Sequence, residues 1–249
     1  MNTMKNIITR AALTCTTSLF IACTPGVNNH PGTAEIESTG MRAIQAQHPD
    51  SIKTLRVWAN QGIVTAQREL GLALTVQPDK QAEAAQWMEK AAKAGDTEAQ
   101  FAFAEANYKA NLGLPQNLAV AWKWYEAAAT KNNAKASFML ARMAKYGEGT
   151  PLDLQKSVHW LKVASDQGNA QAMFLLSNAY ADGDGIAKDP VQARTWLERS
   201  AEGDFPPAIQ ALAMELEGDK KHHDPDKLSA RHLLKEASDE RMLRWNKFQ

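Results

Sequence analysis

The chain has almost no cysteine and no excess of either charge. Only Cys15 and Cys23 occur among its 249 residues, and both lie near the N-terminus. A disulfide framework for the rest of the chain is therefore excluded. Basic and acidic side chains number 28 each. This balance argues against a nucleic-acid partner, because domains that bind nucleic acid usually carry a basic excess.

The sequence also lacks the motifs that mark common enzyme classes. It contains no G-x-S-x-G, no H-E-x-x-H and no P-loop lysine pattern. The one cluster of possible metal ligands is His222–Asp226 (HHDPD), but adjacent side chains diverge and no distant ligand accompanies them at motif spacing. We therefore favour a solvated loop there and expect no catalytic residue, metal, cofactor or small-molecule substrate. A hydrolase with a metal site at His222–Asp226 is the least favoured alternative.

The apolar run near the N-terminus is too short to span a bilayer as a helix. The uncharged stretch Ala11–Ala22 has twelve residues and follows a start that contains Lys5 and Arg10 but no acid. This pattern is typical of a secretory signal. The stretch ends in Phe20-Ile21-Ala22-Cys23, which resembles the lipobox of bacterial lipoproteins.

The lipobox resemblance implies that residues 1–22 are removed as a signal peptide and that Cys23 receives fatty acyl chains such as palmitate. Residues 23–33 are rich in proline, glycine and asparagine and would form a flexible tether to the membrane. In a Gram-negative cell, Thr24 in place of aspartate favours the outer membrane, with the protein facing the periplasm. A plain signal peptide with an incidental cysteine is the alternative.

What the chain has in abundance is internal repetition. Tryptophans recur at intervals of 37, 36 and 36 residues, at Trp87, Trp124, Trp160 and Trp196, and a further 36 lands on His232. Alanines followed four residues later by a large apolar residue keep a similar period, at Ala66, Ala99, Ala136, Ala172 and Ala208. Each unit thus predicts a helix A around this marker alanine and a helix B around the tryptophan. We expect the tryptophan to fill the gap between repeats.

The loops between the two helices look at first like ligand sites, because ADGDGIAKD (Ala181–Asp189) interleaves acids with glycines. The preceding unit has nearly the same pattern, which indicates a role in folding. The glycines predict positive backbone angles after helix A, at Gly147, Gly149, Gly183 and Gly185. The polar residue seven positions before the tryptophan predicts an N-cap of helix B, at Asn117, Asp153 and Asp189.

The pattern A-x-x-x-L-[GAS], G-x-G, D-x-x-x-[AS]-x-x-W-[LY]-x-x-[AS]-[AS] resembles the Sel-one-like repeat, a relative of the tetratricopeptide repeat. The resemblance covers Leu55 to Glu240. It implies an all-α solenoid of antiparallel helix pairs, a right-handed superhelix with a concave surface for protein partners. We place about five units in residues 51–240, with a half-unit at Leu55–Gly62. A leading helix would occupy residues 34–50, and residues 241–249 would end a capping helix.

If the units pack as in tetratricopeptide proteins, helix A lines the concave side. Inward positions are then one residue before the marker alanine and two, six, nine and ten after it. At these positions lie our candidates for partner contact: Glu105, Lys109, Lys135, Arg142, Lys145, Tyr146 and Asn178. The cations and Tyr146 would form a basic patch suited to an acidic or C-terminal segment of a partner. An ordinary solvated helix face is the other interpretation. We attribute the row Phe101, Phe138 and Phe174 to repeat packing.

These features predict a non-catalytic scaffold or adaptor lipoprotein of the bacterial envelope, with other envelope proteins as partners. Assistance to assembly or secretion machinery is the role that the resemblance favours. A regulator or holding subunit of a peptidoglycan-active enzyme is the alternative.

Overall fold

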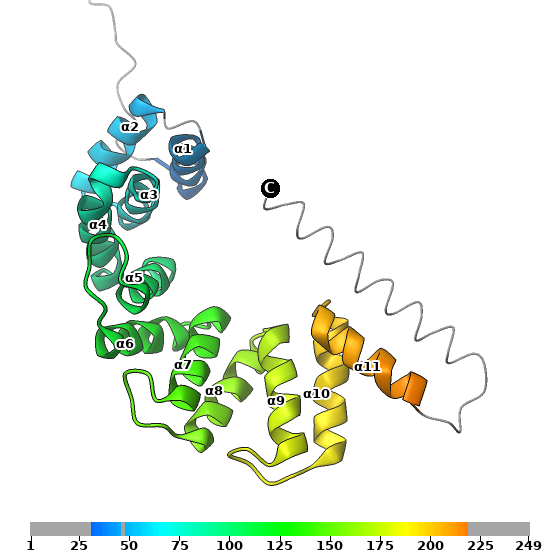
Figure 1. The fold of residues 1–249 in the computed structure, drawn as a ribbon. Helices are drawn as coiled ribbons and strands as arrows, with labels where there is room; N and C mark the ends of the chain where they lie inside the picture. The colour runs from blue at the N-terminus through cyan, green and yellow to red at the C-terminus, as the bar shows by residue number, and fades with distance from the viewer. Residues whose placement is uncertain (1–30, 46–47, 219–249) are drawn as a thin grey trace, which may run out of the picture.

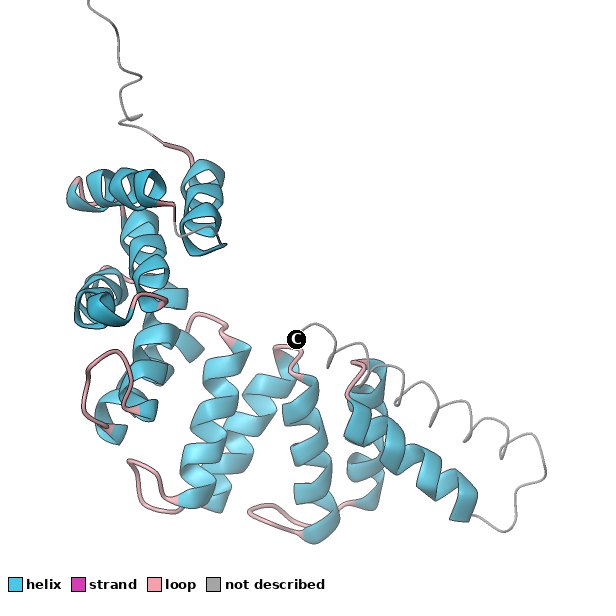
Figure 2. Cartoon of the chain, turned by 45° about the horizontal axis from the view of Figure 1, so that its top comes forward, coloured by secondary structure: helices cyan, strands magenta, loops and turns pink. Residues whose placement is uncertain are grey.

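The computed structural model describes residues 31–45 and 48–218. Within these residues it contains eleven α-helices, one 3-10 helix and no strand (Figure 2). In chain order the helices are α1 (Thr33–Gln45), α2 (Pro49–Asn60), α3 (Val64–Thr75), η1 (Pro78–Lys80), α4 (Gln81–Lys93), α5 (Thr97–Lys109), α6 (Leu118–Ala129), α7 (Ala134–Tyr146), α8 (Leu154–Asp166), α9 (Ala170–Asp182), α10 (Pro190–Glu202) and α11 (Pro206–Gly218).

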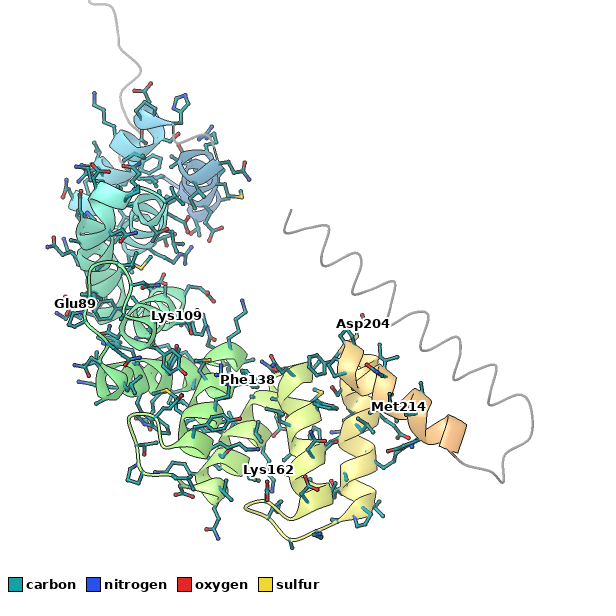
Figure 3. All side chains as sticks on the ribbon, viewed as in Figure 1. Glu89, Lys109, Phe138, Lys162, Asp204 and Met214 are labelled. Carbon is teal, nitrogen blue, oxygen red and sulfur yellow. The ribbon has the colours of Figure 1, made fainter. Side chains whose placement is uncertain are left out.

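Consecutive helices pack side by side along an arc (Figure 1). The helices α1, α3 and α5 lie on the inner side of this arc, and α2, α4 and α6 lie on its outer side. In Figure 3, Glu89 of α4 stands on the outer side, whereas Lys109, at the end of α5, stands nearer the inner side. The predicted all-α solenoid of helix pairs is confirmed.

The repeated small and large apolar residues form the core of the arc. All five marker alanines have no exposed surface. The large residues four positions later are at most 9% exposed: Leu70, Phe103, Leu140, Leu176 and Leu212. The alanines let neighbouring helices approach closely, and the larger side chains fill the space beside them. The apolar face predicted for helix A is therefore its buried face.

Two tryptophans of helix B join neighbouring units. Trp124 packs against the buried clusters on both sides of it, and so does Trp160. The ring of Trp124 meets the ring of Phe103 edge to face, with centroids 5.9 Å apart. For these two units, the expectation that tryptophan fills the gap between repeats is confirmed.

The N-terminal region differs from the expected leading helix and half-unit. The helix α2 begins at Pro49 and buries Leu55 and Trp58. Because α1 and α2 both pack on α3, they form a complete helix pair ahead of the first repeat. The boundary expected at residue 50 thus falls inside α2. The repeat pattern did not predict this pair, because the buried face of α1 includes Thr39 and Gly40 instead of the repeated alanine and leucine.

The loops end the helices as predicted. The side chains of Asn117, Asp153 and Asp189 accept hydrogen bonds from first-turn N–H groups of α6, α8 and α10, at 3.1, 2.8 and 3.0 Å. Gly147 and Gly183 close α7 and α9 with φ angles of 70° and 82°. Side-chain caps and left-handed glycines satisfy the backbone groups that helix ends leave without partners.

The second glycine of each loop has a further reason, which the sequence did not show. Gly149 has a φ of 71°, and a Cβ on it would lie 2.6 Å from the carbonyl oxygen of Leu118. Leu118 begins α6, so the loop after α7 rests on helix B of the preceding unit. Gly185 meets the backbone of Leu154, at the start of α8, in the same way. This contact between units requires a residue without a side chain.

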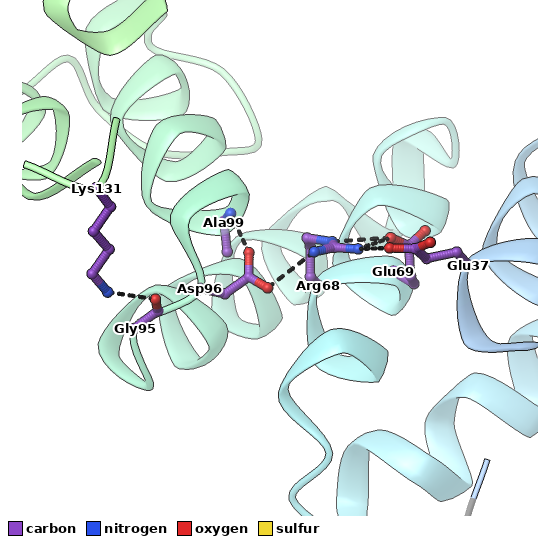
Figure 4. A network of polar contacts seen from close by, with 7 residues as sticks. All are labelled: Glu37, Arg68, Glu69, Gly95, Asp96, Ala99 and Lys131. Carbon is purple, nitrogen blue, oxygen red and sulfur yellow. Dashed lines mark hydrogen bonds and ion pairs between the residues drawn. The ribbon is translucent and has the colours of Figure 1, made fainter. Parts of the chain in front are cut away.

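A polar network ties the N-terminal pair to the first repeats (Figure 4). The Arg68 guanidinium on α3 donates to Glu37 of α1 and to its neighbour Glu69, each at 3.0 Å. A third bond, of 3.1 Å, reaches Asp96, the N-cap of α5. The Glu69 side chain is only 9% exposed. Burial raises the pKa of Glu69, although the hydrogen bond from Arg68 opposes this rise.

Alanine at Gly149 should destabilise the protein more than alanine at Gly113. The two glycines have φ angles of 71° and 72°, but a Cβ on Gly113 would meet nothing within 4 Å. Both variants should lose about 1 kcal/mol for a left-handed alanine, and Gly149→Ala about 1–3 kcal/mol more for the overlap with Leu118. Urea unfolding measures both losses. Equal losses would show that the close approach is unimportant.

Replacing Arg68 with alanine should lower the free energy of unfolding by about 2–4 kcal/mol, because the buried Glu69 carboxylate loses its cation. Arg194→Ala is the matched control. Arg194 pairs with Glu198 and Glu215, but all three side chains are more than 40% exposed, so its loss should be about 0–1 kcal/mol. Urea unfolding of both variants at neutral pH tests the difference.

The loss of unfolding free energy caused by Arg68→Ala, its stability deficit, should also depend on pH. A carboxyl whose pKa is raised by folding contributes stability below its unfolded pKa and loses it as the pH rises through the folded value. Without Arg68 the pKa of Glu69 rises further, so the deficit should be largest at neutral pH and smaller near about pH 4.5. A deficit that is constant between these pH values would contradict the role given to Glu69.

Candidate functional site

The candidate site is a pocket of about 250 Å³ between α7 and α9, with α8 beneath it. We call it the α7–α9 groove. Its lining residues are Phe138, Ala141, Arg142, Lys145, Tyr146, Leu154, Ser157, Val158, Leu161, Gln171, Leu175, Asn178, Ala179, Asp182 and Asp184. Two equivalent helices, each the helix A of its unit, thus form the walls, and the helix B between them forms the base.

The base of the groove is apolar. Phe138 is 8% exposed, and Val158 and Leu161 are each 5% exposed. Leu175 adds a partly buried side chain from α9. The spacing of these residues on their helices puts one apolar face of each toward the same space. An inserted apolar side chain would therefore meet carbon on several sides.

The α7 wall is cationic and the α9 wall is acidic. Arg142, Lys145 and Tyr146 line the first wall, and Tyr146 is 62% exposed. Asp182 at the end of α9 and Asp184 in the following loop line the second. Among the described residues, no ion pair within 4.0 Å joins the two walls. The opposite charges face a shared space without neutralising each other.

Amide side chains complete the α9 wall. Gln171 lies in the first turn of α9 and Asn178 near its centre, and both are exposed. Neither side chain makes a hydrogen bond within the described part of the chain, and the only bond of Arg142 there is a long one of 3.7 Å to the sulfur of Met139. Most of the polar groups around the groove are thus free to bind a ligand.

The structure separates the predicted contact residues into two groups. Arg142, Lys145, Tyr146 and Asn178 line the groove together. Glu105 and Lys109 instead form an ion pair on α5, and Lys135 lies exposed at the start of α7, outside the lining. The expected basic patch is therefore not continuous, because the charge of Lys109 is offset by a carboxylate one helical turn away.

The preceding groove, between α5 and α7, is closed by hydrogen bonds. The hydroxyl of Tyr125 on α6 donates to Glu105. The hydroxyl of Tyr108 on α5 donates to Glu148, after α7, at 2.7 Å. Burial raises the pKa of both tyrosines, and the hydrogen-bonded carboxylates raise it further. The phenols therefore stay protonated donors, and Glu105 has a structural role here.

One repeat later, different residues stand at the positions of these two tyrosines and two glutamates, and the groove is open. Lys145 stands where the preceding unit has Tyr108, and Asp184 where it has Glu148. Leu161 replaces Tyr125 and Arg142 replaces Glu105. Leu161 has no hydroxyl to donate to the residue at position 142. Among the described residues, no ion pair within 4.0 Å joins Lys145 to Asp184. The bond that bridges α5 and the loop after α7 thus has no counterpart between α7 and α9, where the pocket lies.

The phenylalanine row serves packing. The ring centroid of Phe101 lies 5.8 Å from that of Tyr125, and the centroid of Phe174 lies 5.5 Å from that of Phe205. Phe138 belongs to the buried cluster beneath the groove. Sequence reasoning placed these residues on the inward face but missed Leu161, Leu175 and Asp184, because they line the groove only through the packing of three helices.

Several predicted features fall on residues that the structure does not describe. Cys23, the tether up to residue 30, the cluster His222–Asp226 and the residues of the capping helix lie outside the described residues. Within the part of the chain that is described, no group of three or more histidine, cysteine or acidic residues could hold a metal ion. None of the helices there is long and apolar enough to cross a membrane.

An arc of stacked helix pairs with a groove between equivalent helices defines the chain as a helical-repeat solenoid protein. A model of the Sel1 repeat matches residues 65–96, 97–133, 134–169, 170–205 and 206–241. The chain therefore belongs to the Sel1 repeat family, with the five units expected from the sequence. Sel1 repeat proteins are generally scaffolds for protein–protein interactions, and they are typically non-catalytic.

Solved structures agree with this assignment. A Sel1 repeat protein from Oxalobacter formigenes is similar with a TM-score of 0.72 and 23% identity, over 84% of this chain and 88% of that chain. A protective antigen of uropathogenic Escherichia coli strains with an SLR fold also has a TM-score of 0.72, at 22% identity, over 84% of this chain and 46% of that chain. At these identities the likeness shows the fold alone. The comparison with curated proteins gave no match.

Proposed function

We propose that this protein is a non-catalytic adaptor of the bacterial envelope that binds another envelope protein through the α7–α9 groove. The observation that carries this proposal is the groove itself, with an apolar base and a rim of polar side chains of which most lack partners among the described residues. Such a combination gives both buried contact area and directional bonds to a chain segment laid across it. The family's general role as a protein-binding scaffold supports the same conclusion.

The envelope location is part of the proposal and is supported by the N-terminal sequence. Residues Phe20–Cys23 resemble a lipobox, so acyl chains on Cys23 would anchor the protein, on the outer membrane of a Gram-negative cell. Residues 23–33 would hold the solenoid away from the bilayer. In this position the groove would be available to components of an assembly or secretion machine in the periplasm.

Photocrosslinking in intact cells tests the adaptor function. A photoreactive amino acid replaces Arg142, in the groove, and in a matched strain it replaces Gln155, an exposed residue of α8 outside the lining. The expected result is a protein captured from position 142 and not from position 155, which mass spectrometry then identifies. A captured peptidoglycan hydrolase would assign the protein to cell-wall regulation.

Equal capture from both positions, or no capture from position 142, would contradict the proposed groove interaction. The variant proteins must accumulate to the level of the wild type for this comparison to be valid. Both positions carry side chains that make no ion pair in the described part of the chain, so their replacement should leave the fold intact.

Replacing Cys23 with alanine tests the anchor, with Cys15→Ala as control. We expect the wild type and Cys15→Ala to incorporate an alkyne analogue of palmitate and to sediment with membranes. Cys23→Ala should incorporate no label and should leave the membrane fraction, because no acyl chain remains to bury in the bilayer. Label on Cys23→Ala, or an unlabelled wild type, would disprove lipidation at this cysteine.

A further inference from the structure

We infer that the α7–α9 groove selects an extended polypeptide segment that carries an apolar side chain between a carboxylate and a cationic group. The inference rests on the proposed function and adds the chemistry of the bound segment. It departs from the acidic partner segment expected from the sequence, because the structure places carboxylates opposite the cations.

The two walls are charged with opposite sign at the same end of the groove. Lys145 and Tyr146 are the ninth and tenth residues after the marker alanine of α7, and Asp182 is the tenth after that of α9. Since α7 and α9 are equivalent helices of consecutive repeats, these positions lie opposite each other across the pocket that they jointly line. Asp184 adds a second carboxylate on the α9 side.

The charges of the two walls are not paired with each other in the described part of the chain. Lys145 and Asp184 occupy the positions at which Tyr108 and Glu148 bond at 2.7 Å in the preceding groove. In the α7–α9 groove no ion pair within 4.0 Å forms between the described walls. The separation of α7 and α9 is set by buried residues of α8 such as Val158 and Leu161. Each charge is thus available to a ligand group of opposite sign.

The size of the pocket favours a side chain as the inserted group. A volume of about 250 Å³ lies below the roughly 300–1,000 Å³ of sites that enclose small molecules. Phe138, Leu161 and Leu175 offer an apolar base, which suits one leucine-sized or aromatic side chain. The flanking parts of the segment would then pass the charged walls, where a carboxylate meets Arg142 and Lys145 and a cation meets the aspartates.

Binding of short synthetic peptides to the purified full-length protein tests this inference by fluorescence anisotropy. All peptides carry a central leucine. Two carry glutamate and lysine on opposite sides of it, one in each order, and the others carry two glutamates, two lysines or two serines. We expect one of the two mixed peptides to bind at least about fivefold more tightly than the same-charge and serine peptides. Added salt should reduce this difference.

Neutral variants of each wall separate charge recognition from general damage. Lys145→Gln should weaken the binding of the mixed peptide and of the two-glutamate peptide by about three- to tenfold. The affinity for the two-lysine peptide should not change. Asp182→Asn should weaken the binding of the mixed peptide and of the two-lysine peptide, and it should leave the affinity for the two-glutamate peptide unchanged. Lys135→Gln, on α7 outside the groove, should change no affinity. A uniform loss for all peptides in either wall variant would overturn the inference.

Two further results would overturn it. The first is equal binding of all five peptides, or none. The second is self-association, measured by sedimentation, that Arg142→Glu abolishes, since this would assign the groove to a second copy of the chain. The crosslinking at Arg142 stays independent: if it captures a partner while the peptides show no charge rule, the adaptor function stands and only the selectivity fails. If it captures nothing, the proposed function itself fails.

Discussion

The whole structure depends on contact between neighbouring repeats. A single helix pair cannot bury its own apolar face, so each unit is stabilised by the units before and after it. Marker alanines without exposed surface let the helices approach. The residue two positions after the marker alanine contacts the next unit. Arg68 bonds to Asp96 before α5, and Phe174 packs on Phe205 at the corresponding place before α11. One contact is ionic and the other aromatic, yet both join equivalent positions of neighbouring units.

This constraint also decides which residues are left for a partner. Phe174 is committed to packing because it joins two repeats through Phe205, whereas Phe138 belongs to the buried cluster and also lines the base of the groove. The sixth, ninth, tenth and twelfth positions after the alanine face the space between equivalent helices, and their side chains either bridge that space or leave it open. Tyr108 and Glu148 close it between α5 and α7. One repeat later, Lys145 and Asp184 leave it open. A binding groove thus arises from a local change of residues within an otherwise constant framework.

The open groove is organised before any ligand arrives. Its opposite charges belong to different helices, whose spacing is fixed by buried side chains of α8 such as Val158 and Leu161. A shift of α7 toward α9 would compress this packing, and close-packed interiors resist such compression. A bound segment would therefore find Lys145 and Asp182 already in place. Binding would cost less than if the walls first had to separate an existing ion pair.

The sequence by itself determined the solenoid. The period of the tryptophans and alanines predicted the five units, the helix ends at Gly147 and Gly183, and the N-caps, because these depend on local backbone geometry and on one face of a helix. It also placed Arg142 and Lys145 on the inward face. The tertiary structure decided that α1 and α2 form a pair, that Glu105 is committed to Tyr125, and that the acidic wall faces the cations. These features join residues of different helices, and no repeat period records which side chains meet across a gap between units.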